Sequence, residues 1–127
     1  MTDAEIISGC LKHAKTTTRD GTDAENFDAN EELDDLVTDE PERAWPLICE
    51  VIRRISPQDE DILAYGAAGP LEDLLVRHPY AFIDRIESLA RNDAHFRRAV
   101  SGVWGSNSIP SEIRTRLDTL LGDEPRL

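Results

Sequence analysis

The sequence of 127 residues has only two cysteines, and no apolar stretch approaches the roughly 20 residues that a membrane-spanning helix requires. Its first residues have neither the basic start nor the apolar run of a secretory signal. Cys10 and Cys49 each lie among apolar residues at helical spacing, which favours buried free thiols over a disulfide. These absences predict a cytoplasmic protein that does not enter a membrane.

Patterns that bind metals or nucleotides, or that activate a serine, are also missing. The histidines His13, His78 and His95 lie on three different predicted elements, and none has the ligand spacing of a metal site. Gly66 and Gly69 are neither preceded by a strand nor followed by the Gly-Lys-Ser/Thr of a phosphate-binding loop, and no serine occupies a nucleophile elbow. The sequence therefore predicts a protein that is not an enzyme and holds no metal or cofactor.

Strand patterns are nearly absent, because apolar residues recur at spacings of three and four and seldom alternate with polar ones. The chain is predicted to be all-α, a single compact domain of residues 1–127 with about six to eight short helices. The most apolar helix spans residues 41–55. Apolar side chains cover more than half of its circumference, so we expect it to be the central helix, packed on two sides.

Polar and helix-breaking residues set the predicted boundaries. Residues 16–27 are polar, and we expect an exposed or flexible connection there. Gly66 is expected to stop one helix and the chain to restart at Gly69. Residues 122–127 are polar and are expected to form a frayed tail.

One apolar pattern occurs twice, once after Pro41 and once after Pro79. Its anchors, Trp45 and Phe82, are 37 residues apart, which is near the unit of paired-helix solenoids. Two arrangements remain open, a short HEAT-like stack of antiparallel helix pairs and an irregular helical bundle. In both, Trp45 and Trp104 are expected to be core anchors, because each lies at helical spacing from other apolar residues.

Several segments resemble a known family. They are Trp45–Ile48, the stretch AYGAAGPLEDLL from Ala64 to Leu75, Phe82–Ile86, and Phe96–Trp104. In these segments, over about residues 36–121, the chain is similar to the bacterial family called domain of unknown function 6869. The resemblance implies a compact bacterial helical domain and no functional residues, because the family has no established activity. Residues 20–35 are expected to lie mostly outside the matching region.

The strongest feature of the chain is a run of negative charge. Eleven acidic residues lie from Asp20 to Glu42 without one Lys, Arg or His among them. Residues 1–42 hold 13 acids and 3 bases, so they carry −10 of the formal net charge of −12. A one-sided field of this kind attracts basic partners and repels nucleic acid and anionic membranes.

We expect a helix from about Asp28, with Leu33, Leu36 and Val37 facing inward and the carboxylates outward. The like charges at i and i+4 on this helix oppose its stability, which calls for an explanation. The residues expected to bind a basic protein partner are Asp28, Glu31, Glu32, Asp34, Asp35, Asp39 and Glu40.

Three hypotheses for function follow. The first is an immunity-type or antitoxin-type inhibitor whose acidic face neutralises a basic partner such as a toxin nuclease. The second is a helical scaffold or adaptor without an inhibitory role. The third is an enzyme that uses the segment from Gly66 to His78, where Glu72 and Asp73 are adjacent carboxylates; acid near a helix N-terminus is the simpler reading of that pair.

Overall fold

The computed structural model describes residues 1–20, 27–104 and 107–127. Within these ranges the chain is all-α, as predicted, and contains no strand. The helices are α1 (Asp3–Asp20), α2 (Phe27–Asp39), α3 (Pro41–Arg54), α4 (Glu60–Leu63), the π-helix η1 (Ala64–Ala68), α5 (Gly69–Arg77), α6 (Pro79–Asn92), α7 (Ala94–Val100) and α8 (Ser111–Leu121).

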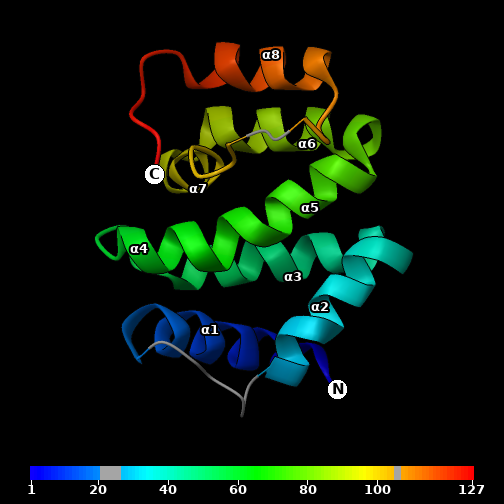
Figure 1. The fold of residues 1–127 in the computed structure, drawn as a ribbon, viewed down its shortest axis with the longest axis vertical. Coiled ribbons are helices and arrows are strands. Elements are labelled where there is room, and N and C mark those ends of the chain that lie inside the picture. Colours follow the sequence, from blue (N-terminus) through cyan, green and yellow to red (C-terminus); the bar gives the residue numbers. More distant parts are fainter. Residues whose placement is uncertain (21–26, 105–106) are drawn as a thin grey trace.

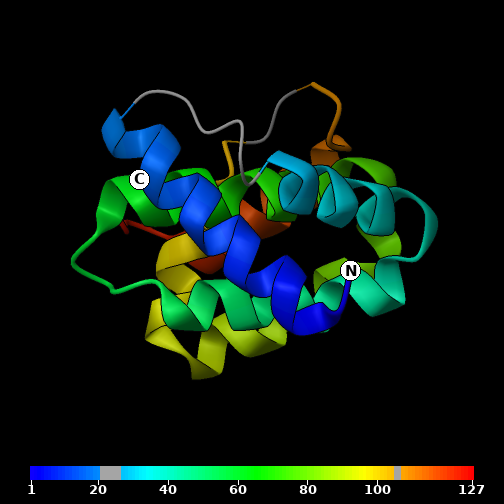
Figure 2. The same cartoon turned by 90° about the horizontal axis from the view of Figure 1, so that it is seen from below.

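The helices lie in layers that follow the order of the chain along the longest axis of the molecule (Figure 1). α1 lies at one end, α3 and the continuous α4–η1–α5 segment lie in the middle, and α6, α7 and then α8 complete the other end. α2 runs obliquely beside α1 toward one end of α3, and the view from below also places α1 and α2 side by side (Figure 2). α2 also contacts α5, so this acidic helix bridges the first two layers.

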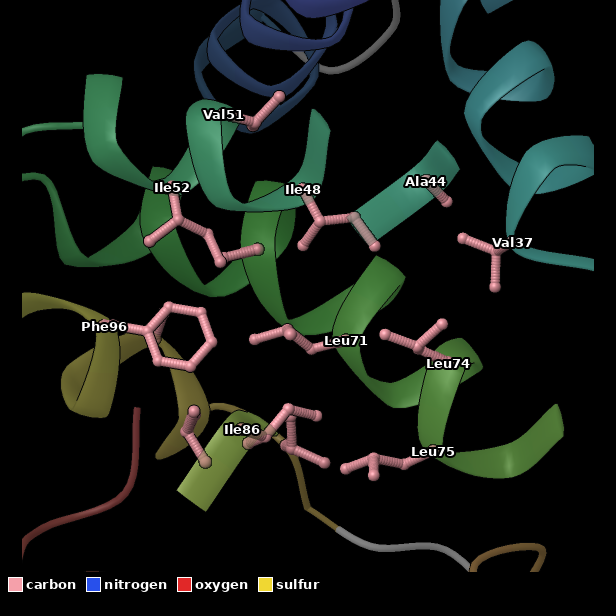
Figure 3. Packing of buried hydrophobic residues seen from close by; sticks show 14 of the residues in the cluster. Val37, Ala44, Ile48, Val51, Ile52, Leu71, Leu74, Leu75, Ile86 and Phe96 are labelled. Carbon is pink, nitrogen blue, oxygen red and sulfur yellow. The ribbon is translucent and has the colours of Figure 1, made fainter. Parts of the chain in front are cut away.

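α3 is the central helix, as its wide apolar surface predicts. It contacts α1, α2, α5, α7 and η1. Val51 points toward α1, whereas Ile48 and Ile52 point away from it toward Leu71 on α5 and Phe96 on α7 (Figure 3). All five side chains are buried. Burial on two opposite sides explains why so few positions of α3 are polar.

The two anchors of the repeated apolar pattern are in direct contact. The ring centroids of Trp45 on α3 and Phe82 on α6 are 5.8 Å apart, and Phe96 lies edge-on to Trp45 at 6.0 Å. Phe82 is fully buried, and Trp45 is half-buried against the core. Such tilted and edge-to-face pairs are the favoured geometries of aromatic rings. The contact joins the middle layer to the α6–α7 layer.

The predicted helix stop at Gly66 was wrong. The chain stays helical from α4 into α5 through the π-helix η1. Pro70 has no N–H for the ordinary α-helical bond, and the wider π turn directly before it accommodates that loss. Gly69 has α-helical dihedral angles (φ −56°, ψ −59°) immediately before Pro70, where a Cβ would be disfavoured.

The predicted connection over residues 16–27 was wrong at both of its described ends. α1 continues to Asp20, and α2 begins at Phe27. Thr16 and Thr18 are half-buried, and the Thr18 hydroxyl donates to the carbonyl oxygen of Ala14 at 2.6 Å. Burial against the core therefore outweighs the low helix propensity of threonine. Residues 21–26 lie outside the described residues.

The predicted frayed tail was also wrong. The N–H of Leu127 donates to the carbonyl oxygen of Ser101 at 3.3 Å, and Arg126 donates to the carbonyl oxygen of Val103 at 3.0 Å. Arg126 also pairs with Asp118 at 2.5 Å. The tail is held because its arginine and main chain meet polar partners that are distant in sequence and that its composition does not reveal.

Trp104 is not a core anchor, which corrects the prediction. Its side chain is 69% exposed, whereas the preceding Val103 is buried. α7 ends at Val100, and the turn that follows changes the direction of the side chains. The prediction continued the helical period past the true end of the helix. The indole N–H of Trp104 donates to the main-chain oxygen of Leu127 at 3.0 Å.

None of the described helices is long and apolar enough to cross a membrane.

Candidate protein interface

A close approach between two helices positions α2. Gly9 on α1 faces Ala29 on α2, and a Cβ added at Gly9 would lie 2.3 Å from the Cβ of Ala29. The Cys10 thiol donates to the carbonyl oxygen of Ala29 at 3.5 Å. Burial raises the pKa of Cys10 to about 11, with a smaller contribution from the Asp34 charge, so at neutral pH the thiol keeps the proton it donates. Only glycine at position 9 allows this packing.

The other end of α2 is held by α5. The Nε2–H of His78 donates to the carbonyl oxygen of Val37 at 2.9 Å. Leu33, Leu36 and Val37 are buried, as predicted, and Ala29 extends the same apolar stripe by one turn. Contacts at both ends therefore fix the rotation of α2 about its axis.

This rotation puts most of the predicted site residues on one outer face. At 100° per residue, five carboxylates fall within an arc of about 100°, roughly opposite the buried stripe. We call these residues the α2 acidic face: Asp28, Glu31, Glu32, Asp35 and Asp39. All are exposed except Glu32, which is half-buried.

The two remaining predicted residues lie beside this face. Asp34 lies on the side of α2 next to α5, where it lines a hollow together with Glu72 and Asp73. Glu40 follows α2 and precedes the first turn of α3, where its side chain makes no capping hydrogen bond. The structure therefore brings five of the seven predicted residues together and places the other two at the edges.

The acidic residues of α2 form no ion pair among the described residues, although the charges of Arg43 and Arg77 lie near some of them. The ion pairs among the described residues use other carboxylates, namely Arg43–Asp3, Arg53–Glu50, Arg54–Glu50, Arg85–Glu42, Arg97–Glu124, Arg98–Glu60, Arg116–Asp84, Arg116–Glu87 and Arg126–Asp118. Within residues 1–20, 27–104 and 107–127, neither the α2 acidic face nor Asp34 or Glu40 takes part in one. The field of this surface is therefore left for solvent or a partner.

A groove runs along the side of α2 that faces α5. It has a volume of about 390 Å³, and its polar lining includes Asn30, Asp34, Tyr65, Glu72 and Asp73. We call it the α2–α5 groove. Its three carboxylates come from two helices that are distant in sequence, so the groove extends the negative surface from α2 onto α5.

Sequence reasoning missed Asn30 and Tyr65. Asn30 precedes Asp34 by four residues, so its place beside Asp34 follows from the helical period. Tyr65 is 44% exposed and lies in η1, and its hydroxyl is 3.0 Å from His13 Nε2. No local signal predicts that an aromatic ring from this small-residue segment faces α2.

Burial and neighbouring negative charges both shift the pKa of Asp34. Partial burial raises its pKa, and the nearby charges of Asp73, Asp35 and Glu31 raise it further, whereas Arg77 opposes the shift. The ionised form of Asp34 is therefore disfavoured in the folded protein.

Asp34→Asn is expected to stabilise the protein at neutral pH. Because the folded-state pKa of Asp34 is raised above its unfolded value, ionisation of this carboxyl costs stability above that pKa, and the cost disappears as pH falls and both states become protonated. Urea unfolding of wild type and variant should therefore differ at about pH 7 and converge at about pH 3. Asp123→Asn removes an equal charge outside the groove and serves as the control. A variant no more stable than wild type at neutral pH would contradict this account of Asp34.

The residues of the enzyme hypothesis are only partly brought together. Glu72 and Asp73 line the α2–α5 groove. His78 does not line it, and its Nε2–H is used in the hydrogen bond to Val37. Among the described residues, no group of three or more His, Cys, Asp or Glu side chains has an arrangement that could hold a metal ion.

The fold and this surface define an all-α domain with an acidic helix whose carboxylates form no ion pair among the described residues. The chain belongs to a family of unknown function, DUF6869, whose model matches residues 17–123. The match includes all of α2, so the expectation that residues 20–35 lie mostly outside the family's region was wrong. No curated protein and no solved structure matches the chain.

Proposed function

We propose that this protein binds a basic protein through the α2 acidic face and the adjoining α2–α5 groove, and that it acts as an immunity-type or antitoxin-type inhibitor. Its partner would be a cationic toxin such as a nuclease. The observation that carries the proposal is that the five carboxylates of the α2 acidic face lie on one outer side of the helix and form no ion pair among the described residues. The proposal needs no chemical step by this protein.

The unpaired charge has a cost that a partner would relieve. Asp28–Glu32, Glu31–Asp35 and Asp35–Asp39 are like-charged pairs at i and i+4, and each destabilises a helix by about 0.2–0.5 kcal/mol. A partner with Lys or Arg opposite these residues turns repulsion into charge-assisted hydrogen bonds. The favoured partner surface is therefore a basic one of matching length.

A nuclease fits this chemistry because its substrate is a polyanion. The Lys and Arg side chains that hold phosphates would pair with carboxylates spaced along α2 and across to Glu72 and Asp73. Occupying those cations blocks the substrate without any contact to the catalytic atoms. Complementary fields also speed the encounter, which suits an inhibitor that must capture a toxin quickly.

Affinity capture from extracts of the source organism tests the proposal. We expect the wild-type chain to retain a basic protein whose activity it inhibits, and Glu31→Lys with Asp35→Lys to lose both capture and inhibition. The control is Asp61→Lys with Asp123→Lys. It changes the net charge equally on α4 and the tail after α8, which lie on the side of the molecule away from α2 (Figure 1).

The outcomes separate the hypotheses. Equal loss in both variants would reduce the effect to net charge and remove the α2 acidic face as the site. Capture without inhibition would favour the scaffold or adaptor role. Capture that survives reversal of α2 would overturn the proposal.

A further inference from the structure

A second hollow lies at the opposite end of the molecule, beside α8. It has a volume of about 280 Å³, and its lining includes Trp104, Ser111, Arg114, Thr115, Asp118 and Arg126. The four residues from α8 are spaced i, i+3, i+4 and i+7, so they form one polar stripe on the helix. Ile113 and Leu117 of the same helix are buried in the core, which fixes the direction of the polar stripe.

The cations of this hollow differ in their surroundings. The guanidinium of Arg126 already has partners within the protein: it pairs with Asp118 at 2.5 Å and donates to the carbonyl oxygen of Val103 at 3.0 Å. Arg114 forms no ion pair with any of the described residues, and its Nε–H is shut off from solvent without an acceptor among them. Arg116, two residues further along α8, instead pairs with Asp84 and Glu87. Arg114 is thus a half-buried guanidinium without an ion-pair partner among the described residues.

An exposed aromatic ring lies in the same lining. Trp104 is 69% exposed and is the most exposed of the large apolar side chains in the described residues. Its indole N–H donates to the main-chain oxygen of Leu127 at 3.0 Å, which restrains the ring. The restrained indole offers a flat surface against which an aromatic ring can pack, and the guanidinium in the same lining can donate two hydrogen bonds to an anionic group.

From this juxtaposition we propose that the hollow binds a small aromatic monocarboxylate, with its carboxylate on Arg114 and its ring against Trp104. The charges favour a monoanion, because Arg126 and Asp118 neutralise each other and Arg114 leaves one net positive charge. The planar guanidinium matches a carboxylate with two parallel N–H···O bonds, and the hydroxyl of Ser111 is a further donor in the lining. The hydroxyl of Thr115 already donates to the main-chain oxygen of Ser111 at 3.0 Å. A doubly charged phosphate is disfavoured because the lining has only one net positive charge to match it.

The test uses benzoate as the probe and the indole N–H signals of the two tryptophans as readouts in ¹H–¹⁵N NMR spectra. We expect benzoate to shift the Trp104 signal in a saturable way and to leave the Trp45 signal, which comes from the core, unchanged. Benzamide has the ring without the charge, acetate has the charge without the ring, and phenyl phosphate is the dianion. Each should bind more weakly than benzoate.

Arg114→Gln should weaken benzoate binding at least tenfold, whereas Arg114→Lys should retain part of it. Arg91→Gln on α6 is the matched control, because Arg91 is exposed and does not line the hollow. The Trp45 signal reports whether each variant remains folded. The proposal is overturned if benzoate gives no saturable shift, if Arg114→Gln binds it as wild type does, or if phenyl phosphate binds more tightly. It does not depend on the α2 acidic face, so the two proposals fail or succeed separately.

Discussion

Gly9→Ala is expected to destabilise the protein by about 1–3 kcal/mol, the usual cost of overpacking a core. The added Cβ would lie 2.3 Å from the Cβ of Ala29, so α1 and α2 must move apart. Alanine favours a helix over glycine by about 1 kcal/mol, which offsets part of the strain. A net loss of stability would therefore show that the clash costs more than the gain in helix propensity. Urea unfolding followed by circular dichroism measures the change.

A double-mutant cycle isolates this contact. In the background of Ala29→Gly, the clashing atom is gone, and Gly9→Ala should then be neutral or stabilising because only its helix propensity remains. Ser8→Ala, at an exposed position next to Gly9, is the control and should change stability by no more than about 0.5 kcal/mol. Equal destabilisation by Gly9→Ala in both backgrounds would show that the contact with Ala29 does not position α2.

The contact matters for the proposed function because α2 has little to hold it except its apolar stripe. Its outer face is repulsive, and its two ends are fixed by Ala29 against α1 and by the hydrogen bond from His78 to Val37. Gly9→Ala should therefore also impair binding of a basic partner more than its effect on global stability alone explains.

Local patterns in the sequence were enough to predict the all-α fold and the central helix. The apolar residues of α3 recur at helical spacing, and burial follows from that spacing wherever a helix has a regular period. The same reasoning placed Leu33, Leu36 and Val37 inward on α2. It therefore also predicted which carboxylates face outward, because the positions that are buried fix the rotation of the helix and so the positions on its opposite side.

The errors lie where the period changes or where distant segments meet. η1 widens the helical turn before Pro70, and the turn after Val100 ends the period that would have buried Trp104. The tail is held by contacts with Ser101 and Val103, which composition cannot indicate. Each case depends on tertiary contacts that override local propensity.

The candidate interface also has one part that the sequence could predict and another that depends on contacts between distant segments. The α2 acidic face follows from one helix, so the sequence could predict it. In the α2–α5 groove Asp34 lies near Asp73 of another helix. Burial raises the pKa of Asp34, and the charge of Asp73 raises it further, so the shift reflects contacts that the sequence of α2 alone does not show. The hollow beside α8 likewise joins Trp104 to a helix that begins only at Ser111.

Reversing the charge of the acidic helix is expected to have the largest effect on function. With Glu31, Glu32, Asp34 and Asp35 all changed to Lys, association with the basic partner should slow by about 10- to 1000-fold at low salt, because electrostatic steering is replaced by repulsion. Dissociation should change less for exposed rim charges than association does. Stopped-flow mixing at about 20 mM and about 500 mM salt measures the rate and its salt dependence, since screening shortens the range of the field.

The salt dependence separates a local face from net charge. Wild type should associate faster at low salt, and the fourfold variant should lose or invert this dependence, because opposite charges attract and like charges repel over the same range. The association rate of the double variant Glu31→Lys, Asp35→Lys should lie between those of wild type and the fourfold variant. The double variant Asp61→Lys, Asp123→Lys changes the net charge by the same amount as that double variant, but its rate should stay near that of wild type. Circular dichroism checks that each variant keeps its helices. An association rate that the fourfold variant leaves unchanged would remove the α2 acidic face from recognition, because the partner would then be captured by a surface whose field does not depend on these carboxylates.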